Sequence, residues 1–273
     1  MRWRLRRSAA ARQYGDEQLA KMPIVIGNAM PKSGSHLLHQ ILLGLTQIGP
    51  FVDPGMQPIT RSQSNQNLKQ KIVLDNIAQL KAGDIAYGYF QSKPIYVKAL
   101  SRENIASIFV TRDPRDVLVS HVFYATEMYA GHGMHAYYNE LPNMEARLNA
   151  AILGVDKGKY QLSGIRSKYD VYMGWFSTPR VEKVQFEALI LNQERSLEGI
   201  IRFLTSRGWN LAMDKTKAIA SLVQAIRPKQ SGTFRGGRVG DWQKYFTDDN
   251  KRVFKKAAGD LLQTLNYEKN NKW

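Results

Sequence analysis

Four short apolar runs alternate along the chain with segments of helical spacing. The runs span residues 23–27, 85–90, 106–111 and 181–186 and are rich in β-branched and aromatic side chains. Continuous apolar runs of this kind are typical of parallel strands buried on both faces. The pattern therefore predicts an α/β fold in which a parallel sheet is flanked by helices.

Helical periodicity is clearest in three segments. Residues 36–48 carry one apolar stripe, and residues 214–226 carry a looser one. Residues 248–265 carry a regular stripe preceded by Thr247, a favourable N-cap residue, with two aspartates in the first turn. We expect a helix at each place.

Other segments show no regular period. Residues 52–70 are polar and rich in turn formers, so we expect a loop there, while residues 131–165 permit no assignment. The first twenty residues are basic and lack the apolar centre of a secretion signal. We expect a mobile basic arm over residues 1–20 and a single domain over residues 21–273.

Composition narrows the environment of the protein. The 273 residues include no cysteine, which excludes disulfides, thiolate nucleophiles and Cys-ligated zinc and is consistent with a reducing, cytoplasmic location. The longest apolar run, residues 37–48, is too short and too polar to cross a bilayer. We therefore expect no membrane span.

The net charge is +16 at pH 7, with an isoelectric point near 9.9. A positive field of this size attracts polyanions, and both nucleic acids and small charged nucleotides fit it. Charge alone does not distinguish them.

The stretch "VIGNAMPKSGSHLL" is the first with identifiable chemistry. An apolar strand leads into a turn and then a helix, but the pattern G-x-x-x-x-G-K-[ST] of triphosphate loops is absent, with Pro31 at the position of the second glycine. Backbone N–H groups at the helix start, the Lys32 cation and the hydroxyls of Ser33 and Ser35 suit an anion. The alternative is an ordinary turn with a surface lysine.

The second stretch is "SIFVTRDPRDVLVSHVFY". Arg112 ends an apolar strand, Asp113 is a good N-cap, Pro114 fits the first helical position, and Asp116 can complete a capping box. Ser120 falls on the same face of that helix. Open α/β sheets bind ligands at the carboxyl ends of strands, so Arg112 and Ser120 are candidates for anion binding. In the alternative, Arg112 only pairs with Asp116.

The third stretch is "GTFRGGRVGDWQKYF", residues 232–246, in which glycines surround Arg235 and Arg238. Glycines let a backbone approach an anion closely, and the arginines can grip it. A flexible surface loop or a single-strand nucleic-acid contact are the alternatives.

In order and spacing the three stretches together resemble the cytosolic-type sulfotransferases that use 3′-phosphoadenylyl sulfate (PAPS). PKSGSHL (31–37) is similar to the family's 5′-phosphosulfate loop, and RDPRDVLVS (112–120) is similar to its 3′-phosphate element. FRGGRVGDWQKYF (234–246) is similar to its RKGxxGDW element, and GWF (174–176) and VQFEAL (184–189) are weaker matches. The resemblance covers residues 22–267.

The resemblance implies a three-layer sandwich like that of the P-loop nucleotide hydrolases, with PAPS as donor, adenosine 3′,5′-bisphosphate as product and no metal. It also implies a small-molecule acceptor as partner and no specific nucleic acid, and it leaves the oligomeric state open. The residues implied at the 5′ end are Lys32, Ser33, Gly34, Ser35 and His36. Those implied at the 3′-phosphate are Arg112, Ser120, Arg235 and Gly237, with further nucleotide contacts from Phe186, Phe234 and Gly236. Gly236 replaces a cation of the family motif, and Arg238 can substitute for it.

The implied reaction is an in-line attack of an acceptor oxygen or nitrogen on sulfur, with Lys32 stabilising the leaving oxygen. The chain departs from the family at the general base, because Tyr89 stands where a histidine is usual. A different histidine can act, an amine acceptor can need little help, or the protein binds the nucleotide without turnover. The five histidines of the chain are His36, His39, His121, His132 and His135. As the general base we favour His132 and His135.

Two other functions are compatible with parts of the sequence. A phosphotransferase using ATP is disfavoured by the missing Gly-Lys pair and by the lack of a clear strand-end aspartate for magnesium. A basic nucleic-acid-binding protein is compatible with the charge, and steeply salt-dependent binding would identify it.

Overall fold

The computed structural model describes residues 2–56, 58–227 and 236–273. The chain divides into two compact units. Unit 1 comprises residues 1–111 and 174–231, and unit 2 comprises residues 112–173 and 232–273. Among the described residues, no helix is both long enough and apolar enough to span a bilayer.

Unit 1 is built on a parallel sheet of strand order β2-β1-β3-β6. The strands are β1 (Ile24–Ala29), β2 (Ile85–Gly88), β3 (Ile105–Thr111) and β6 (Val181–Gln185). Every residue of β1 and β3 is buried, as central strands covered on both faces require. All four strands predicted from the apolar runs are confirmed.

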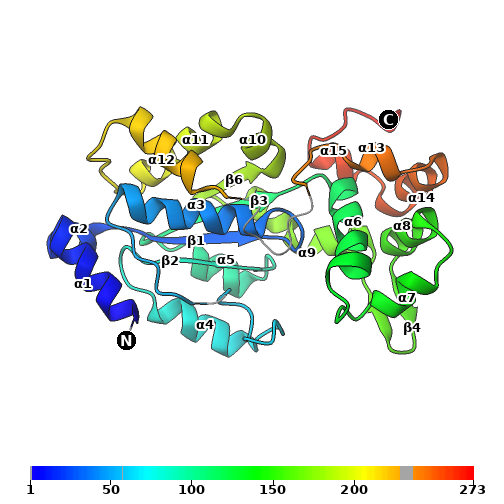
Figure 1. Ribbon diagram of the computed structural model, residues 1–273, viewed down its shortest axis with the longest axis horizontal. Helices are drawn as coiled ribbons and strands as arrows, with labels where there is room; N and C mark the ends of the chain where they lie inside the picture. Colours follow the sequence, from blue (N-terminus) through cyan, green and yellow to red (C-terminus); the bar gives the residue numbers. More distant parts are fainter. Residues whose placement is uncertain (1, 57, 228–235) are drawn as a thin grey trace. The chain divides into compact units, whose positions relative to one another are not determined.

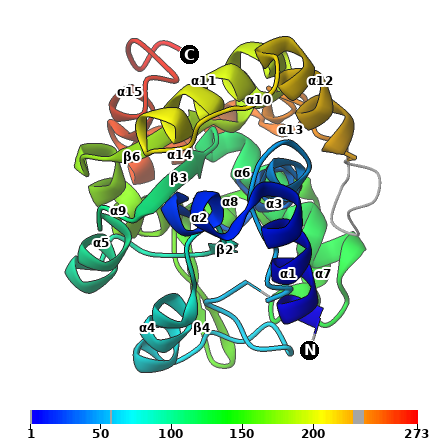
Figure 2. The same cartoon turned by 90° about the vertical axis from the view of Figure 1, so that its left-hand side faces the viewer.

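Helices cover both faces of this sheet. Figures 1 and 2 both place α4 (Gln70–Gln79) and α5 (Pro94–Leu100) on one face and α11 (Gln193–Ser206) and α12 (Lys215–Ala225) on the other. On the second face α3 (Ser35–Ile48) packs on β1 and β2, and α12 packs on α3. The remaining helices are α1 (Arg2–Tyr14), α2 (Asp16–Lys21) and α10 (Phe186–Leu191). The predicted three-layer α/β sandwich is confirmed.

The apolar stripe of α3 explains its place on the sheet. Leu38, Ile41, Leu42 and Leu45 are fully buried. A Cβ at Gly27 of β1 would lie 2.8 Å from a methyl carbon of Leu38, so the glycine permits the close approach of helix and strand. The packing therefore fixes where α3 begins relative to the end of β1.

We expected the basic N-terminal arm to be mobile, but it is folded and makes contacts with the rest of unit 1. Its residues form α1 and α2, and Arg6 pairs with Asp53 at 2.6 Å. Arg7 and the indole N–H of Trp3 both contact the buried carboxylate of Asp84, at 3.2 and 3.3 Å. The arm is ordered because its charges find partners distant in sequence. The division into an arm and one domain stays a prediction.

Unit 2 contains mainly helices. Its first half has α6 (Pro114–Phe123), the π-helical turn η1 (Tyr124–Met128), α7 (His135–Glu140), α8 (Met144–Leu153) and the hairpin of β4 (Val155–Lys157) with β5 (Tyr160–Leu162). Its second half has α13 (Trp242–Tyr245), α14 (Asp248–Ala258) and α15 (Leu261–Thr264). α9 (Ile165–Ser177) begins in unit 2 and ends in unit 1. α8 packs against both α6 and α14.

The single helix predicted over residues 248–265 is wrong in one respect. Thr247 caps α14 as expected, in a reciprocal capping box with Asn250, but the helix ends at Gly259. Gly259 has a φ of 59°, and a left-handed glycine terminates an α-helix. The apolar stripe continues because α15 buries Leu261 and Leu262 in the same core.

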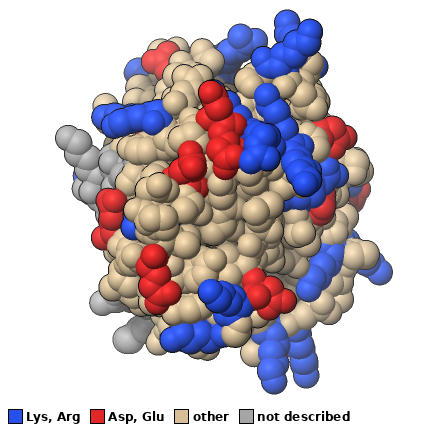
Figure 3. All heavy atoms as spheres, turned by 90° about the vertical axis from the view of Figure 1, so that its right-hand side faces the viewer, with Lys and Arg blue, Asp and Glu red and all other residues tan. Residues whose placement is uncertain are grey.

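Charge is distributed rather than gathered on the face drawn in Figure 3. Lysine and arginine side chains alternate there with aspartate and glutamate. A dedicated nucleic-acid surface would show one basic stripe. On this face the positive side chains do not form such a stripe, despite the net charge of +16.

Candidate functional site

The anion loop (residues 30–35) connects β1 to α3 in unit 1. Lys32 and Gly34 both adopt a left-handed backbone, with φ of 71° and 101°. A non-glycine residue in that region is uncommon, and such residues cluster at functional sites where the surroundings hold them. The lysine predicted to bind an anion therefore lies in a constrained turn.

Ser33 holds the anion loop in place. Its side chain is fully buried, and its hydroxyl lies 2.8 Å from the carbonyl oxygen of Met30 and 3.2 Å from that of Val110 in β3. Its backbone N–H also donates to Met30. Ser33 thus ties the loop to the neighbouring strand, and its hydroxyl proton is engaged within the protein.

Gly34 packs directly against Phe186, the first residue of α10. A Cβ at position 34 would lie 2.5 Å from the ring carbon Cδ2 of Phe186, closer than any real Cβ contact. The positive φ and the lack of space each require glycine here. Phe186 itself is buried, so its ring supports the anion loop from within unit 1.

The first turn of α3 carries no acidic residue and no side-chain cap within the described part of the chain. The backbone N–H groups of an uncapped first turn, together with the helix dipole, favour an anion. The Ser35 hydroxyl lies 3.0 Å from the phenol oxygen of Tyr89. The start of α3 therefore combines an uncapped terminus, of the kind that suits an anion, with a pair of hydrogen-bonded hydroxyls.

Tyr89 directly follows β2, and its position is fixed by its neighbours. Its backbone N–H donates to the Thr60 hydroxyl at 3.0 Å, and the guanidinium of Arg61 lies 5.3 Å from its ring centroid. A cation at this distance is attracted by the quadrupole of the ring, so Arg61 helps to hold the ring in place. Arg61 was missed by sequence reasoning, although it lies in the polar loop over residues 52–70.

Asn28 was also missed, and Trp175 was noted only as part of the weaker match GWF (174–176). The side chain of Asn28, buried in β1, exchanges two hydrogen bonds with the backbone of Phe90, at 2.9 and 3.1 Å. The indole N–H of Trp175 donates to the carbonyl oxygen of Phe90 at 2.7 Å. These bonds anchor the chain immediately after Tyr89. A polar residue inside an otherwise apolar strand was the available signal for Asn28.

Two histidines of α3 lie in the same unit as Lys32 and Tyr89. His39 stacks on Tyr87 with ring centroids 4.4 Å apart. Burial lowers the pKa of His39, the Asp53 charge opposes this, and the charge of His36 adds to it. Desolvation and the Lys32 cation lower the pKa of His36, and burial raises the pKa of Tyr87 to about 12.

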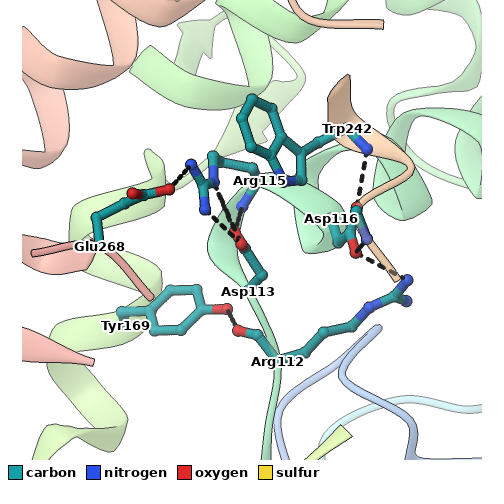
Figure 4. Close-up of polar contacts among 8 residues, drawn as sticks. Arg112, Asp113, Arg115, Asp116, Tyr169, Trp242 and Glu268 are labelled. Carbon is teal, nitrogen blue, oxygen red and sulfur yellow. Dashed lines mark hydrogen bonds and ion pairs between the residues drawn. The ribbon is translucent and has the colours of Figure 1, made fainter. Parts of the chain in front are cut away.

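Unit 2 begins with the arginine–aspartate turn (residues 112–116), shown in Figure 4. Asp113 caps α6 by accepting the backbone N–H of Arg115 at 2.8 Å, and Pro114 takes the first helical position, as predicted. The buried guanidinium of Arg115 pairs with Asp113 at 2.7 Å and Glu268 at 2.6 Å. It also lies 3.9 Å from the ring centroid of Trp242.

Asp116 does not complete a capping box, contrary to our expectation. Its two carboxylate oxygens accept the backbone N–H groups of Gly240 and Trp242, each at 2.9 Å. The Arg112 guanidinium lies 3.6 Å from the same carboxylate and donates to the Arg238 carbonyl oxygen at 3.0 Å. The acid is used for a partner distant in sequence, which local capping rules do not anticipate.

The third predicted element lies only partly in the described chain. Phe234 and Arg235 fall outside the described residues. Gly236 and Gly237 are described, and Gly237 has a φ of 58° that favours glycine. Arg238, our proposed substitute cation, contacts Arg112 through its backbone carbonyl.

The two favoured histidines lie around α7 in unit 2. Nδ1 of His132 accepts the backbone N–H of Met134 at 3.1 Å. Nδ1 of His135 lies 2.8 Å from the carbonyl oxygen of Ala125, and its Nε2 lies 3.1 Å from the amide nitrogen of Asn139. Because a carbonyl only accepts, Nδ1 of His135 carries the proton.

The structure thus groups the predicted site residues by unit. The anion-loop residues with His36, Phe186 and Tyr89 share unit 1, whereas Arg112, Ser120, Gly236, Gly237 and the two histidines around α7 belong to unit 2.

Comparison with known proteins decides the family. The model of the sulfotransferase domain matches residues 24–266. The chain belongs to the sulfotransferase family. The resemblance inferred from the three motifs is confirmed.

Solved structures share the sulfotransferase fold at low sequence identity. Mouse sulfotransferase SULT7A1 complexed with PAP is 18% identical, with a TM-score of 0.58 over 94% of this chain and 90% of that chain. Retinol dehydratase in complex with androsterone and the inactive cofactor PAP is 14% identical, with a TM-score of 0.56 over 90% of this chain and 83% of that chain. Retinol dehydratase in a complex with retinol and PAP is 13% identical, with a TM-score of 0.55 over 90% and 84%. At these identities the likeness shows the fold alone.

Proposed function

We propose that this sulfotransferase transfers a sulfuryl group from PAPS to a hydroxyl or amine of a small-molecule acceptor. The observation that carries the proposal is the uncapped start of α3 beside Lys32, which is held at a φ of 71°. This arrangement suits an anion without requiring a metal, because N–H donors and an ammonium supply the positive charge. When bound, PAPS supplies the sulfuryl group and departs as adenosine 3′,5′-bisphosphate.

We assign the 5′ end of the nucleotide to unit 1. Lys32, Gly34, Ser35 and His36 hold it, while Ser33 shapes the loop from beneath, since its hydroxyl already bonds backbone carbonyls. Phe186 has a supporting place, because its ring fills the space beside Gly34.

We assign the 3′-phosphate to unit 2. Arg112, just before α6, and Ser120, in the second turn of α6, bind it. They are joined by residues of the glycine-rich stretch, namely Phe234, Arg235, Gly236 and Gly237. The buried guanidinium of Arg112 supports this assignment, because charge-assisted hydrogen bonds to phosphate are strongest where water is largely excluded.

In the proposed reaction, the acceptor attacks sulfur while Lys32 stabilises the charge on the leaving oxygen. Tyr89 orients the acceptor through its own hydroxyl, which is hydrogen-bonded to that of Ser35. His132 and His135 remain our proposed bases for the acceptor proton. His135 must first release Asn139, and His132 must first release Met134, to accept a proton on the bonded nitrogen.

The second candidate is a family member that binds the nucleotide with little or no turnover. The observation that favours it is Tyr89, a phenol bonded to Ser35, at the position where the family usually has its base. An unperturbed phenol titrates near pH 10 and is a poor base at neutral pH.

The test has two stages. Adenosine 3′,5′-bisphosphate should raise the melting temperature in the absence of magnesium, and ATP with magnesium should raise it less. The reverse order would overturn the proposal in favour of an ATP-dependent enzyme. Labelled PAPS is then incubated with a panel of phenols, alcohols and amines, and label transfer distinguishes an active enzyme from a binding-only protein.

The nucleic-acid alternative needs its own measurement. Affinity for duplex and single-stranded oligonucleotides is measured between 50 and 200 mM salt, that is, over about the range in which phosphate contacts lose strength. We expect weak binding that adenosine 3′,5′-bisphosphate does not compete. Tight, sequence-dependent binding that survives added nucleotide would favour the alternative.

A further inference from the structure

Asp116 joins two parts of unit 2 that are distant in sequence. It is fully buried in the first turn of α6, and both of its oxygens accept backbone N–H groups from residues 240 and 242. The same carboxylate faces Arg112 at 3.6 Å. Figure 4 shows the side chains of Arg112 and Asp116 pointing toward each other beside the segment that leads to Trp242.

A buried carboxylate is costly unless its charge is balanced and its oxygens are hydrogen-bonded. Here the balance comes from Arg112 and from the two amides. A purely structural anchor could bind the amides without the arginine. Arg112, however, also donates to the carbonyl of Arg238, only two residues before the amide of Gly240. The arginine and the glycine segment (residues 236–242) are therefore held against each other through one carboxylate.

We propose that Asp116 is a positioning residue for the 3′-phosphate end of the nucleotide. It fixes the Arg112 guanidinium and the backbone of the glycine segment in one arrangement before the ligand arrives. This inference rests on the proposed function, because it presumes that Arg112 and the glycine segment receive the 3′-phosphate.

The geometry explains why such a residue improves recognition. A guanidinium carries five N–H donors, so one arginine can bind a carboxylate, a carbonyl and a phosphate at the same time. An arginine held in its binding orientation loses less side-chain entropy when the ligand binds. Gly240, with a φ of 75°, turns the backbone so that its N–H reaches Asp116. Glycine is the residue that adopts this conformation without strain.

The decisive comparison uses two ligands that differ in the 3′-phosphate. Affinities for adenosine 3′,5′-bisphosphate and for adenosine 5′-monophosphate are measured by calorimetry on the wild type and on Asp116→Asn. We expect the variant to bind the bisphosphate on the order of tenfold more weakly, as removal of an outer positioning partner does elsewhere, and the monophosphate as before. Equal losses for both ligands, or no loss, would overturn the inference.

Asp113→Asn is the matched control on the same helix. It weakens the cap of α6 and the ion pair to Arg115 and leaves the carboxylate of Asp116 in place. We expect a lower melting temperature with an unchanged ratio of the two affinities. A changed ratio in this control would show that general loosening of α6 is sufficient, and Asp116 would lose its specific role.

If Asp116→Asn does not fold, Gly240→Ala provides a second test. It perturbs the same hydrogen bond at its donor, the backbone N–H of residue 240. Among the described residues, leaving out the two chain neighbours, no heavy atom lies within 4 Å of the Cβ position, so the change acts through the positive φ. Gly15→Ala is matched to it, because Gly15 has a φ of 87° and equally open surroundings in unit 1. We expect a lower ratio of bisphosphate to monophosphate affinity for Gly240→Ala alone. If the wild type binds neither ligand, the proposed function fails, and that outcome is distinct from failure of the inference.

Discussion

Two strands of the same sheet lead into helices whose N-termini differ in capping and in charge. α3 follows β1 through the anion loop, and its first turn has neither an acidic residue nor a side-chain cap in the described chain. α6 follows β3 directly, and its N-terminus is capped by Asp113, with Asp116 in the first turn. The first terminus leaves its positive end without an acidic side chain, and the second has its positive end neutralised by the protein's own acids.

Under the proposed function, one topology supplies two kinds of anion site. At α3 the proposal assigns binding to backbone amides and the helix dipole, and an acid in the first turn would oppose it. At α6 the acids have structural partners, and the cation offered is a side chain, Arg112, held by Asp116. A site made of backbone is sensitive to loop shape, whereas a site made of side chains is sensitive to the residues that orient them.

Lys32→Ala has the largest expected effect, because it removes the only side-chain cation that the proposal assigns to the leaving oxygen. We expect turnover of PAPS to fall by about 10²–10³-fold, as for loss of a donor to developing negative charge, with a smaller change in KM. Steady-state kinetics with labelled PAPS measure both quantities. Lys93→Ala, at an exposed lysine of unit 1, controls for net charge, and near-normal turnover of Lys32→Ala would contradict the assigned role.

Arg112→Ala should act on the other end of the nucleotide and chiefly on affinity. We expect binding of adenosine 3′,5′-bisphosphate to weaken by about 2–4 kcal/mol, as when one partner of a buried charge pair is lost. Calorimetry measures the change. If affinity for the bisphosphate is unaltered, the 3′-phosphate is bound elsewhere, and the contrast between the two helix termini no longer explains nucleotide binding.

Sequence patterns predicted the strands and helix starts of the two sites better than the tertiary contacts around them. Strands were predictable because runs such as that of β3 are apolar throughout, and the cap at Asp113 was predictable because it depends only on neighbouring residues. The break at Gly259 was missed because the apolar period continues across it. The order of α1 was missed because its partners, Asp53 and Asp84, are far away in the sequence.

The candidate site residues show the same difference between local patterns and distant contacts. Lys32 and Arg112 were predicted from motifs, since each lies in a local pattern with chemical meaning. The role of Asp116 was not predictable, because its hydrogen-bond partners follow more than a hundred residues later. Arg61 and Asn28 act through contacts with Tyr89 and Phe90 that only the folded chain creates. Local rules find the residues, and tertiary structure decides what each of them does.

Ser35→Asp would convert the open terminus of α3 into one resembling that of α6. A carboxylate in the first turn stabilises an isolated helix but repels an anionic ligand. We expect nucleotide affinity to fall by about tenfold while the melting temperature changes little, since terminal charges contribute roughly 0.3–1 kcal/mol. Ser35→Asn has nearly the same shape without the charge, and it also breaks the Tyr89 contact. If both variants lose affinity equally, the hydroxyl matters and the open terminus does not.

The smallest effect concerns the pH dependence of stability at the open terminus. Burial, reinforced by the charge of His36 and opposed by Asp53, lowers the pKa of His39 in the folded chain. The unfolded chain then binds the proton more readily, so folding stability is complete above the ordinary histidine pKa of about 6.5 and decreases as the pH falls below it.

His39→Phe keeps an aromatic ring on Tyr87 and removes this titration. Between pH 7.5 and pH 5.5, we expect its melting temperature to fall less than that of the wild type, by on the order of 2 °C. Part of the dependence should remain, because the pKa of His36 is also lowered, by desolvation and by Lys32. Thermal melts of the two proteins at both pH values measure the difference. An identical pH dependence in the variant would mean that His39 is as well solvated in the folded protein as in the unfolded chain, and its packing on Tyr87 would then have no electrostatic consequence.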